Sequence, residues 1–309
     1  MIIGVTGGAG FIGSNLTKRL ERSGHEIVVI DNFISGKKSN LEGSKTKIIE
    51  ADLQDKASVA KFVSQVDAVV HLGALGSVPR SIENPINSFG SNVIGTLNLL
   101  EEVRNKNIHL IFSSSSSVYG RNTKSPKSEL EWLTPLSPYA ATKLSCEALI
   151  LSYANSYNLK TLVFRLFNVF GPFQSADHAY AAVIPKWGLA ALKKEKIVIY
   201  GDGEQSRDFT YVDTVTEVIE DALLNKVTSD FPVNLALGRA ISLNTVLHKF
   251  QEYFGELSLD YQPPRKGDIR DSLSDPSNLK KLFPKITEID FDYSLRQTLD
   301  WVSETYKTL

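Results

Sequence analysis

The sequence predicts an α/β fold: a doubly wound parallel sheet followed by a smaller C-terminal α/β domain. Two observations carry this prediction. In the first half of the chain, short runs rich in Val and Ile alternate with segments of helical periodicity, which is typical of parallel βαβ units. In addition, the first of these runs ends in a glycine-rich turn, Gly7-Gly8-Ala9-Gly10-Phe11-Ile12-Gly13, where a helix would begin.

The expected strands are short apolar runs bounded by Gly, Asp or Asn, at residues 2–6, 26–30, 47–49, 68–71, 108–113 and 161–165. The helices expected between them lie at residues 11–23, 56–64, 85–105 and 138–157. The first helix ends before Gly24, which suits the left-handed conformation often found just past a helix. Beyond residue 170 the alternation loosens. We therefore expect a first domain at residues 1–170 and a second mainly at residues 171–309, with later segments returning to the first.

The composition limits the classes of function. With 309 residues, 42 % of them hydrophobic, the chain can bury a large core. Its 34 basic and 35 acidic residues nearly cancel, which gives no reason to expect a nucleic-acid partner. The sole cysteine, Cys146, excludes an internal disulfide and suits a reducing compartment. No apolar run approaches the roughly 18 residues of a membrane span, and the first residues do not resemble a secretory signal. We expect a cytoplasmic protein with no membrane partner and no metal site.

The glycine-rich turn has the spacing of a dinucleotide-binding loop. Gly7, Gly10 and Gly13 stand three residues apart, where glycine permits a tight turn, close approach to a pyrophosphate and close packing of helix on strand. Phe11 and Ile12 then open a helix whose N-terminal N–H groups favour phosphate. Strand, turn and helix together predict a Rossmann-type domain that binds a dinucleotide; a glycine turn without a ligand is the alternative interpretation.

An acidic residue follows at the expected distance. Asp31 ends the second strand, where a carboxylate bonds the adenosine ribose hydroxyls and repels a 2′-phosphate. This favours NAD over NADP, although Lys37 and Lys38 follow closely. His71, at the end of the fourth strand, is expected to be a packed histidine and not a base. Further cofactor contacts are expected from Asn32, Asp52, Leu53, Leu72, Ala74 and Asn92.

The segment Ser137-Pro138-Tyr139-Ala140-Ala141-Thr142-Lys143 pairs a phenol with an ammonium group. Pro138 suits the first turn of a helix, which places Tyr139 and Lys143 four residues apart on one face. A free phenol has a pKa of about 10. A nearby ammonium and a cationic nicotinamide lower that pKa and make Tyr139 a base, while Lys143 can also bond the nicotinamide ribose. An ordinary amphipathic helix is the alternative.

Six motifs together resemble the extended short-chain dehydrogenase/reductase superfamily, in its nucleotide-sugar epimerase/dehydratase branch: TGGAGFIG, DNFISG, SSSSSVYG, SPYAATK, RLFNVFGP and GDGEQSRDF. The resemblance extends over nearly the whole chain. It implies that Ser115, the third of five consecutive serines, acts with Tyr139 and Lys143. In such epimerases the tyrosine takes the proton of a sugar C4 hydroxyl while C4 gives hydride to NAD. The 4-keto sugar then turns and takes the hydride back on its other face.

The resemblance also implies a site for a UDP-sugar. It places Asn168, Arg207 and Arg265 on the pyrophosphate, which suits the forked hydrogen bonding of arginine, and Asp268 near the ribose. Arginines in solvated surface loops are the alternative. The other expected substrate contacts are Ser77, Arg80, Ser115, Ser116, Val183, Tyr200 and Ser272.

Four of the five serines bear on the type of reaction. Ser116 and Ser117 precede V-Y-G, where related dehydratases carry an acidic pair and UDP-glucuronate decarboxylases an acidic residue. Because hydroxyls cannot serve as that acid–base pair, C4 epimerisation is the expected reaction. Ser113 and Ser114 depart from close relatives, which often have alanines there. The extra hydroxyls can alter the proton network or bond the backbone at the strand end.

Two features bear on the sugar. Residues 74–81 and 179–187 closely resemble those of bacterial UDP-N-acetylglucosamine (UDP-GlcNAc) 4-epimerases. At the position of Ser272, epimerases restricted to UDP-glucose and UDP-galactose tend to carry a tyrosine, which fills the space that an acetamido group needs. The expected substrates are therefore UDP-GlcNAc and UDP-N-acetylgalactosamine (UDP-GalNAc), with UDP-glucose and UDP-galactose left open. The alternatives are a UDP-uronate 4-epimerase, with Arg80 or Lys186 near C6, a reductase that releases NAD, and a non-catalytic nucleotide sensor.

The family commonly dimerises through two helices, here at residues 85–105 and 138–157. Both segments carry apolar residues that suit such an interface, although core packing explains them equally well: Leu97, Leu99, Leu100, Leu144, Ala148 and Leu149. A homodimer is expected.

Overall fold

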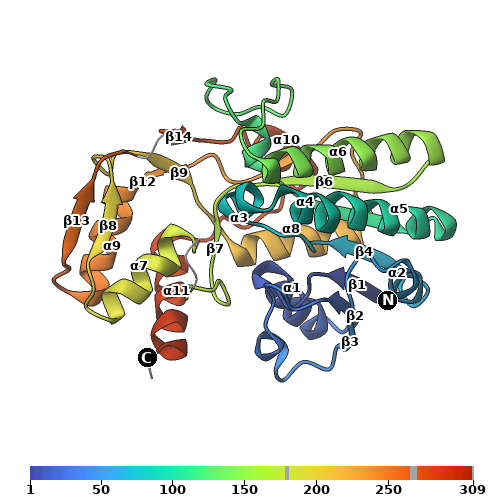
Figure 1. The fold of residues 1–309 in the computed structure, drawn as a ribbon, viewed down its shortest axis with the longest axis horizontal. Helices are drawn as coiled ribbons and strands as arrows, with labels where there is room; N and C mark the ends of the chain where they lie inside the picture. The colour runs from blue at the N-terminus through green and yellow to red at the C-terminus, as the bar shows by residue number, and fades with distance from the viewer. Residues whose placement is uncertain (178–180, 265–269, 308–309) are drawn as a thin grey trace.

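The computed structural model describes residues 1–177, 181–264 and 270–307. It contains a seven-stranded sheet in the order β11-β6-β5-β4-β1-β2-β3, in which every pairing is parallel (Figure 1). The predicted doubly wound α/β fold is confirmed. The strand order reverses between β1 and β4, and ligands of such sheets bind beyond the carboxyl ends of the strands at this point. The strands are β1 Ile2–Thr6, β2 Glu26–Asp31, β3 Lys47–Glu50, β4 Ala68–His71, β5 His109–Ser115, β6 Thr161–Leu166 and β11 Val233–Leu235.

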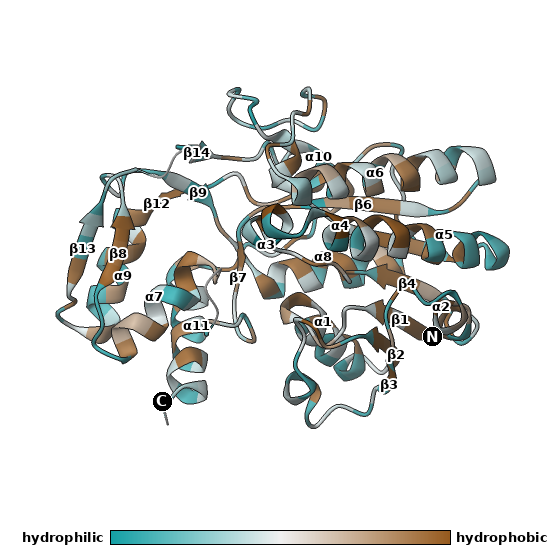
Figure 2. Ribbon diagram, in the orientation of Figure 1, coloured by the Kyte–Doolittle hydropathy of each residue, from teal (hydrophilic) through white to brown (hydrophobic). Residues whose placement is uncertain are grey.

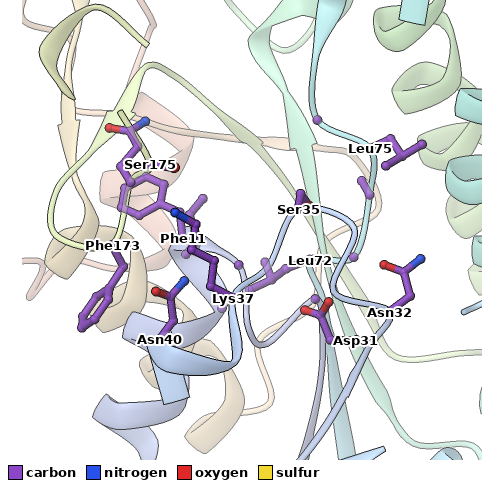
Figure 3. A pocket seen from close by; sticks show the side chains of 18 of the residues that line it. Phe11, Asp31, Asn32, Ser35, Lys37, Asn40, Leu72, Leu75, Phe173 and Ser175 are labelled. Atoms are coloured by element: carbon purple, nitrogen blue, oxygen red, sulfur yellow. The ribbon is translucent and has the colours of Figure 1, made fainter. Parts of the chain in front are cut away.

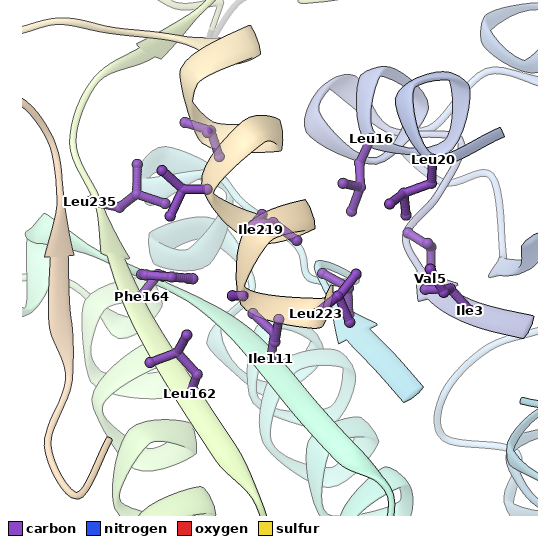
Figure 4. Packing of buried hydrophobic residues seen from close by; sticks show 14 of the residues in the cluster. Ile3, Val5, Leu16, Leu20, Ile111, Leu162, Phe164, Ile219, Leu223 and Leu235 are labelled. Atoms are coloured by element: carbon purple, nitrogen blue, oxygen red, sulfur yellow. The ribbon is translucent and has the colours of Figure 1, made fainter. Parts of the chain in front are cut away.

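Helices cover both faces of this sheet. α1 and α8 pack on one face, where Figure 4 shows Leu16 and Leu20 of α1 and Ile219 and Leu223 of α8 beside the strands. α2, α5 and α6 pack on the other face. Strands covered on both sides need apolar side chains at successive positions, which explains the runs of Val and Ile. These helices are α1 Phe11–Arg22, α2 Lys56–Val63, α5 Gly95–Lys106, α6 Pro138–Tyr157 and α8 Val212–Leu224.

The five-serine run begins in a strand and ends in a turn. β5 extends two residues beyond the expected 108–113, and Ser113 to Ser115 stay paired with β6. Hydrogen bonds to β6 are available whatever the side chain, so serine does not end the strand there. The last two serines open a 3₁₀ turn, Ser116–Tyr119. The run therefore lies at the carboxyl edge of the sheet, beside the point where the strand order reverses.

The helix expected at residues 85–105 is divided. α4 (Pro85–Phe89) is joined to α5 by one π-helical turn, Gly90–Ile94. Two glycines let this helix pass close to the loop after β3: a Cβ at Gly90 would lie 2.6 Å from Gln54 Oε1, and one at Gly95 2.9 Å from Leu53 Cβ. The sequence pattern also missed α3 (Val78–Glu83), which is too short to show helical periodicity.

The later residues build a smaller α/β unit, on the left in Figure 1, around a core that includes Trp187, Phe250 and Leu295. Figure 2 shows the contrast between the apolar central strands of the large sheet and the hydrophilic outer end of α5. Two elements that follow residue 170 are part of the first unit: β11 is a strand of the large sheet, and α8 packs on one of its faces. The other elements are β7 Val169–Phe170, α7 Val183–Leu192, β8 Ile197–Tyr200, β9 Ser206–Asp208, β10 Thr210–Tyr211, β12 Ala240–Ser242, α9 Leu243–Phe254, β13 Leu259–Gln262, β14 Asp271–Ser272, α10 Ser277–Leu282, α11 Phe291–Thr305 and the short 3₁₀ helix Lys38–Leu41. Within the described ranges, none of the helices is both long and apolar enough to cross a bilayer.

Candidate active site

The glycine turn after β1 is packed so tightly that two of its positions require glycine. Gly7 has a φ of +67°, and a Cβ there would lie 2.7 Å from the Cα of Gly73. A Cβ at Gly13 would lie 2.2 Å from the carbonyl oxygen of Gly7. The turn therefore lies directly against the start of α1, whose N-cap residue, Gly10, has no side chain to occupy the helix end. This leaves the N-terminal N–H groups facing an open cleft, as a bound pyrophosphate requires.

This cleft, with a volume of about 530 Å³, runs from the glycine turn across the carboxyl ends of β2 and β4. Figure 3 shows Asp31 and Asn32 on one side of it and Phe173 and Ser175 on the other, with Lys37 between them. Most of the predicted cofactor residues line it: Gly7, Gly10, Phe11, Ile12, Gly13, Asp31, Asn32, Asp52, Leu53, Leu72 and Ala74. Residues that the sequence analysis did not assign also line it, among them Ser35, Asn40, Gln174, Trp301 and Tyr306.

Asp31 connects the second strand to the glycine turn. Its carboxylate accepts hydrogen bonds from the backbone N–H of Ala9, at 3.0 Å, and of Phe33, at 2.8 Å. Burial raises the pKa of Asp31, and these two N–H donors act against that rise. Beside it, the Asn32 amide donates to the Asp52 carboxylate at 2.6 Å. The expected ribose-binding carboxylate is therefore in place at the cleft wall and held by the backbone of the loop.

Two predicted residues serve the packing around the cleft. Asn92 is not among the residues lining it: its side chain accepts from Leu75 N–H at 2.8 Å and donates to Thr142 Oγ1 at 2.9 Å. It thus ties the loop after β4 to α6. His71 is buried between the hydroxyls of Thr6 and Thr96, and burial lowers its pKa to about 3. The expectation of a packed, neutral histidine is confirmed.

The predicted chemical residues come together where α6 crosses the end of β5. Ser137 caps α6 by accepting from Ala140 N–H, and the helix then presents Tyr139 and Lys143 to the strand. The Ser115 side chain lies beside the Tyr139 phenol, close enough to influence its pKa. Lys143 is only 4 % exposed, and its Nζ donates to the carbonyl of Ser113 at 2.7 Å.

Burial dominates the ionisation of both side chains. It raises the pKa of Tyr139, and the neighbouring Ser115 hydroxyl opposes that rise. It lowers the pKa of Lys143 to about 8, while Cys146 and Glu147 act to raise it. The sequence analysis expected the tyrosine pKa to fall. In the chain alone burial raises it, and Lys143 is not among the groups that lower it. The expected fall therefore depends on the positive charge of a bound nicotinamide and stays a prediction.

A second cavity, of about 670 Å³, lies between the sheet and the smaller unit. Four predicted substrate residues line it: Asn168, Val183, Tyr200 and Arg207. Lys186 and Gln205, which also line it, add polar groups. Gln174 and Ala182 line both cavities, so the two adjoin.

The remaining predicted substrate residues are scattered. Ser77 and Arg80 line the first cavity. Ser272 is half-buried in β14 and stands opposite Arg207 of β9 in the parallel register. Ser116 begins the turn after β5. Arg265 and Asp268 lie outside the described residues.

Comparison with known proteins identifies the family. The model of the NAD dependent epimerase/dehydratase family matches residues 3–236. The chain belongs to this family. The resemblance inferred from the motifs is confirmed, and so is NAD as the cofactor. That the glycine turn and Asp31 hold it stays a prediction.

Three solved structures of the family are similar to this chain in sequence and in fold over nearly their whole length. The UDP-GlcNAc 4-epimerase of Methanobrevibacter ruminantium, in complex with UDP-N-acetylmuramic acid, is 40 % identical, with a TM-score of 0.93 and 98 % of each chain covered. The UDP-glucose 4-epimerase of Thermotoga maritima, with UDP-glucose, is 33 % identical, with a TM-score of 0.91 and coverage of 99 % and 100 %. The UDP-glucuronic acid 4-epimerase of Bacillus cereus, with UDP-glucuronic acid and NAD, is 28 % identical, with a TM-score of 0.88 and the same coverage. Other relatives are decarboxylases and dehydratases.

Proposed function

We propose that this protein catalyses the reversible C4 epimerisation of a UDP-hexose, with UDP-GlcNAc and UDP-GalNAc as the preferred pair. The observation that carries the proposal is the contact of Tyr139 with Ser115 at the end of β5, with Lys143 one helical turn further along α6. The turn that follows has Ser116 and Ser117 in place of the acids that elimination requires.

The chain's own residues divide the work of proton transfer and binding. Tyr139 takes the proton of the C4 hydroxyl and Ser115 shares it, while the Lys143 ammonium stabilises the phenolate. NAD, held by residues that line the first cavity, would supply the acceptor and then the donor of the C4 hydride. Arg207 and Asn168 hold the diphosphate in the second cavity. The family resemblance assigns Arg265 to the same diphosphate and Asp268 to the ribose. Because the diphosphate is held and the hexose is not, the 4-keto sugar can present its other face.

The choice of an N-acetylated sugar rests on Ser272 and on the relatives. A small residue at this position, in register with the diphosphate residue Arg207, leaves room beside the sugar. The 40 % identical structure is that of a UDP-GlcNAc 4-epimerase, which supports this choice. A UDP-uronate is the second candidate, because the Arg80 side chain lines the cavity next to Ser77 and can pair with a carboxylate.

We also propose a homodimer. Leu99 and Leu100, expected at its interface, are fully buried in the core of the chain itself. Of the other expected residues, Leu97, Leu144 and Leu149 are half-buried and Ala148 is exposed. Exposed apolar side chains also lie on α3 and α4, where Ile82 is 62 % exposed and Ile86 85 %. α4 contacts α6, so these side chains lie beside the helix pair that was expected to form the interface. Light scattering on the purified protein tests the dimer, and a monomer at micromolar concentration would contradict it.

The function is tested by product analysis. The purified protein is incubated separately with UDP-GlcNAc, UDP-glucose and UDP-glucuronate, without added NAD, and the C4 epimers are separated by chromatography. We expect UDP-GalNAc to form fastest and the Tyr139→Phe variant to form none. Turnover of UDP-glucuronate alone would keep Tyr139 as the base and reject our choice of sugar. If none of the three substrates turns over even with NAD added, the proposed reaction is wrong.

A further inference from the structure

Three side chains of α6, each one turn apart, contact three successive serines of β5. Tyr139 lies beside the Ser115 side chain, Lys143 donates to the Ser113 carbonyl, and the Ser114 hydroxyl donates to Glu147 Oε1. The epimerase site described above uses the first two contacts. Glu147 is 2 % exposed and Ser114 also 2 %, so their contact is sealed from solvent and from the substrate.

A buried arginine holds the Glu147 carboxylate. Arg165 Nη2 donates to Oε2 at 2.8 Å and Nε donates to Oε1 at 3.0 Å, and both side chains are 3 % exposed. Arg165 lies in β6, directly opposite Ser114 in the register with β5. The two-pronged geometry fixes the carboxylate plane, and with it the direction of the bond to Ser114.

The arginine is itself held from the far side. Its Nη1 donates to the Tyr119 hydroxyl at 3.1 Å and to the Glu129 carbonyl at 3.3 Å. The Tyr119 hydroxyl donates to Asn234 Oδ1 at 2.7 Å. Buried polar networks in which each member has partners are rigid, because breaking one bond leaves a charged group without compensation.

We propose that Glu147 is a positioning residue of the active site: held by Arg165, it fixes the end of β5 through Ser114 and keeps the Lys143 ammonium charged and in place. The carboxylate acts on the reaction only through these two residues, since it is buried and lines neither the first nor the second cavity.

The electrostatic surroundings of Lys143 single out Glu147. The titratable groups that act on it or neighbour it are Tyr139, Cys146 and Glu147 of α6 and His71 of β4. Burial raises the pKa of Tyr139 and of the Cys146 thiol and lowers that of His71 to about 3, so these three are neutral at pH 7. Among these groups, Glu147 is therefore the one that carries a charge opposite to that of the ammonium.

The test compares two charge-removing substitutions in the same network. Glu147→Gln removes the charge beside Lys143. Glu129→Gln, the matched control, removes a buried carboxylate that accepts from Asn234 N–H at 2.8 Å, beyond Arg165 as seen from Lys143. The wild type and both variants are produced with lysine labelled at ¹³Cε and ¹⁵Nζ and are saturated with NAD. The Lys143 signal is assigned by its loss in the Lys143→Arg variant. Its titration midpoint is then followed by nuclear magnetic resonance.

We expect the midpoint of Lys143 to fall by about one pH unit in Glu147→Gln, the order of effect of one nearby opposite charge, and to stay unchanged in Glu129→Gln. An unchanged midpoint in Glu147→Gln, or equal shifts in both variants, would overturn the proposal. If Glu147→Gln does not fold, the double variant Glu147→Gln/Arg165→Met replaces it, since replacing both partners avoids an uncompensated buried charge. The same shift is expected there, and its absence would have the same meaning.

A kinetic readout connects this inference to the reaction, and this part rests on the proposed function. In Glu147→Gln the fall of kcat at high pH should begin about one unit lower than in the wild type, with KM unchanged. Ser114→Ala should lower kcat without moving the pH profile. If no UDP-sugar is turned over but the lysine midpoint shifts as expected, the proposed function fails and the role of Glu147 stands. If turnover is normal and the midpoint does not move, only the role of Glu147 fails.

Discussion

Substitution of Gly13 by alanine should abolish tight NAD binding by steric means alone. The new Cβ would lie 2.2 Å from the Gly7 carbonyl oxygen and 2.7 Å from the Gly8 Cα, roughly 1 Å or more inside normal contact distances. Both are backbone atoms, so no side chain can turn away and α1 must move. Overpacking of this kind costs about 1–3 kcal/mol, occasionally more. Because the N-terminus of α1 moves with it, we expect the Kd for NAD to rise at least tenfold, or about 1.4 kcal/mol.

The other end of the same helix provides the control. Gly24 has a φ of +83°, and a Cβ there would meet nothing within 4 Å. Gly24→Ala therefore carries only the backbone cost of the left-handed conformation, about 1–2 kcal/mol, and should bind NAD as the wild type does. Calorimetric titration measures NAD binding, and thermal unfolding shows that both variants are folded. Wild-type NAD affinity in Gly13→Ala would refute the argument that this glycine sets the position of the helix.

Three further predictions concern the reaction and the stability. In the pH profile of kcat, activity should fall as the pH rises through about 8, because Lys143 loses its proton there; a rate that keeps rising to pH 10 would contradict this. Ser272→Tyr should reduce kcat/KM for UDP-GlcNAc at least about a hundredfold by filling the space for the acetamido group, yet spare UDP-glucose; equal effects on both would reject steric selection. Arg165→Met leaves Glu147 buried without its partner, which costs about 3–5 kcal/mol and lowers Tm by roughly 5–8 °C for a chain of this length. Scanning calorimetry measures this, and a Tm within about 1 °C of wild type would show that the pair is not needed for stability.

The sequence predicted those parts of the site that depend on local spacing. The glycine turn, Asp31, and the Tyr139–Lys143 pair each lie within one loop or one helix, where residue order fixes the geometry. The parallel strands were also predictable, because continuous apolar runs indicate strands that are buried on both faces. The register of β5 with β6 was out of reach, since it depends on pairing between segments about fifty residues apart.

Residues that reach the site from distant segments were missed. Trp301 and Tyr306 line the NAD cleft from the end of the chain, and no local pattern connects them with the glycine turn. The Asn40 amide donates to the Ala9 carbonyl at 2.9 Å. Its short distance from Asp31 in the sequence was a weak indication that it lies near the cleft. Glu147 carried a better one: it continues the four-residue spacing of Tyr139 and Lys143 along α6. A charged residue on a buried helical stripe indicates a partner, but the sequence does not say which.

The position of Glu147 also bears on the proposal of epimerisation in preference to elimination. A dehydratase needs a carboxylic acid that can exchange protons with the sugar, and the turn after β5 offers Ser116 and Ser117 instead. The Glu147 carboxylate is bound to this strand through Ser114, two residues before the turn begins at Ser116. Its oxygens already accept from Ser114 and from two nitrogens of Arg165, and the side chain is sealed from solvent. A carboxylate so paired and enclosed is not free to exchange a proton with the substrate, so it cannot replace the missing acid. Tyr139 is then left as the proton-transfer group, which suffices for oxidation and reduction at one carbon.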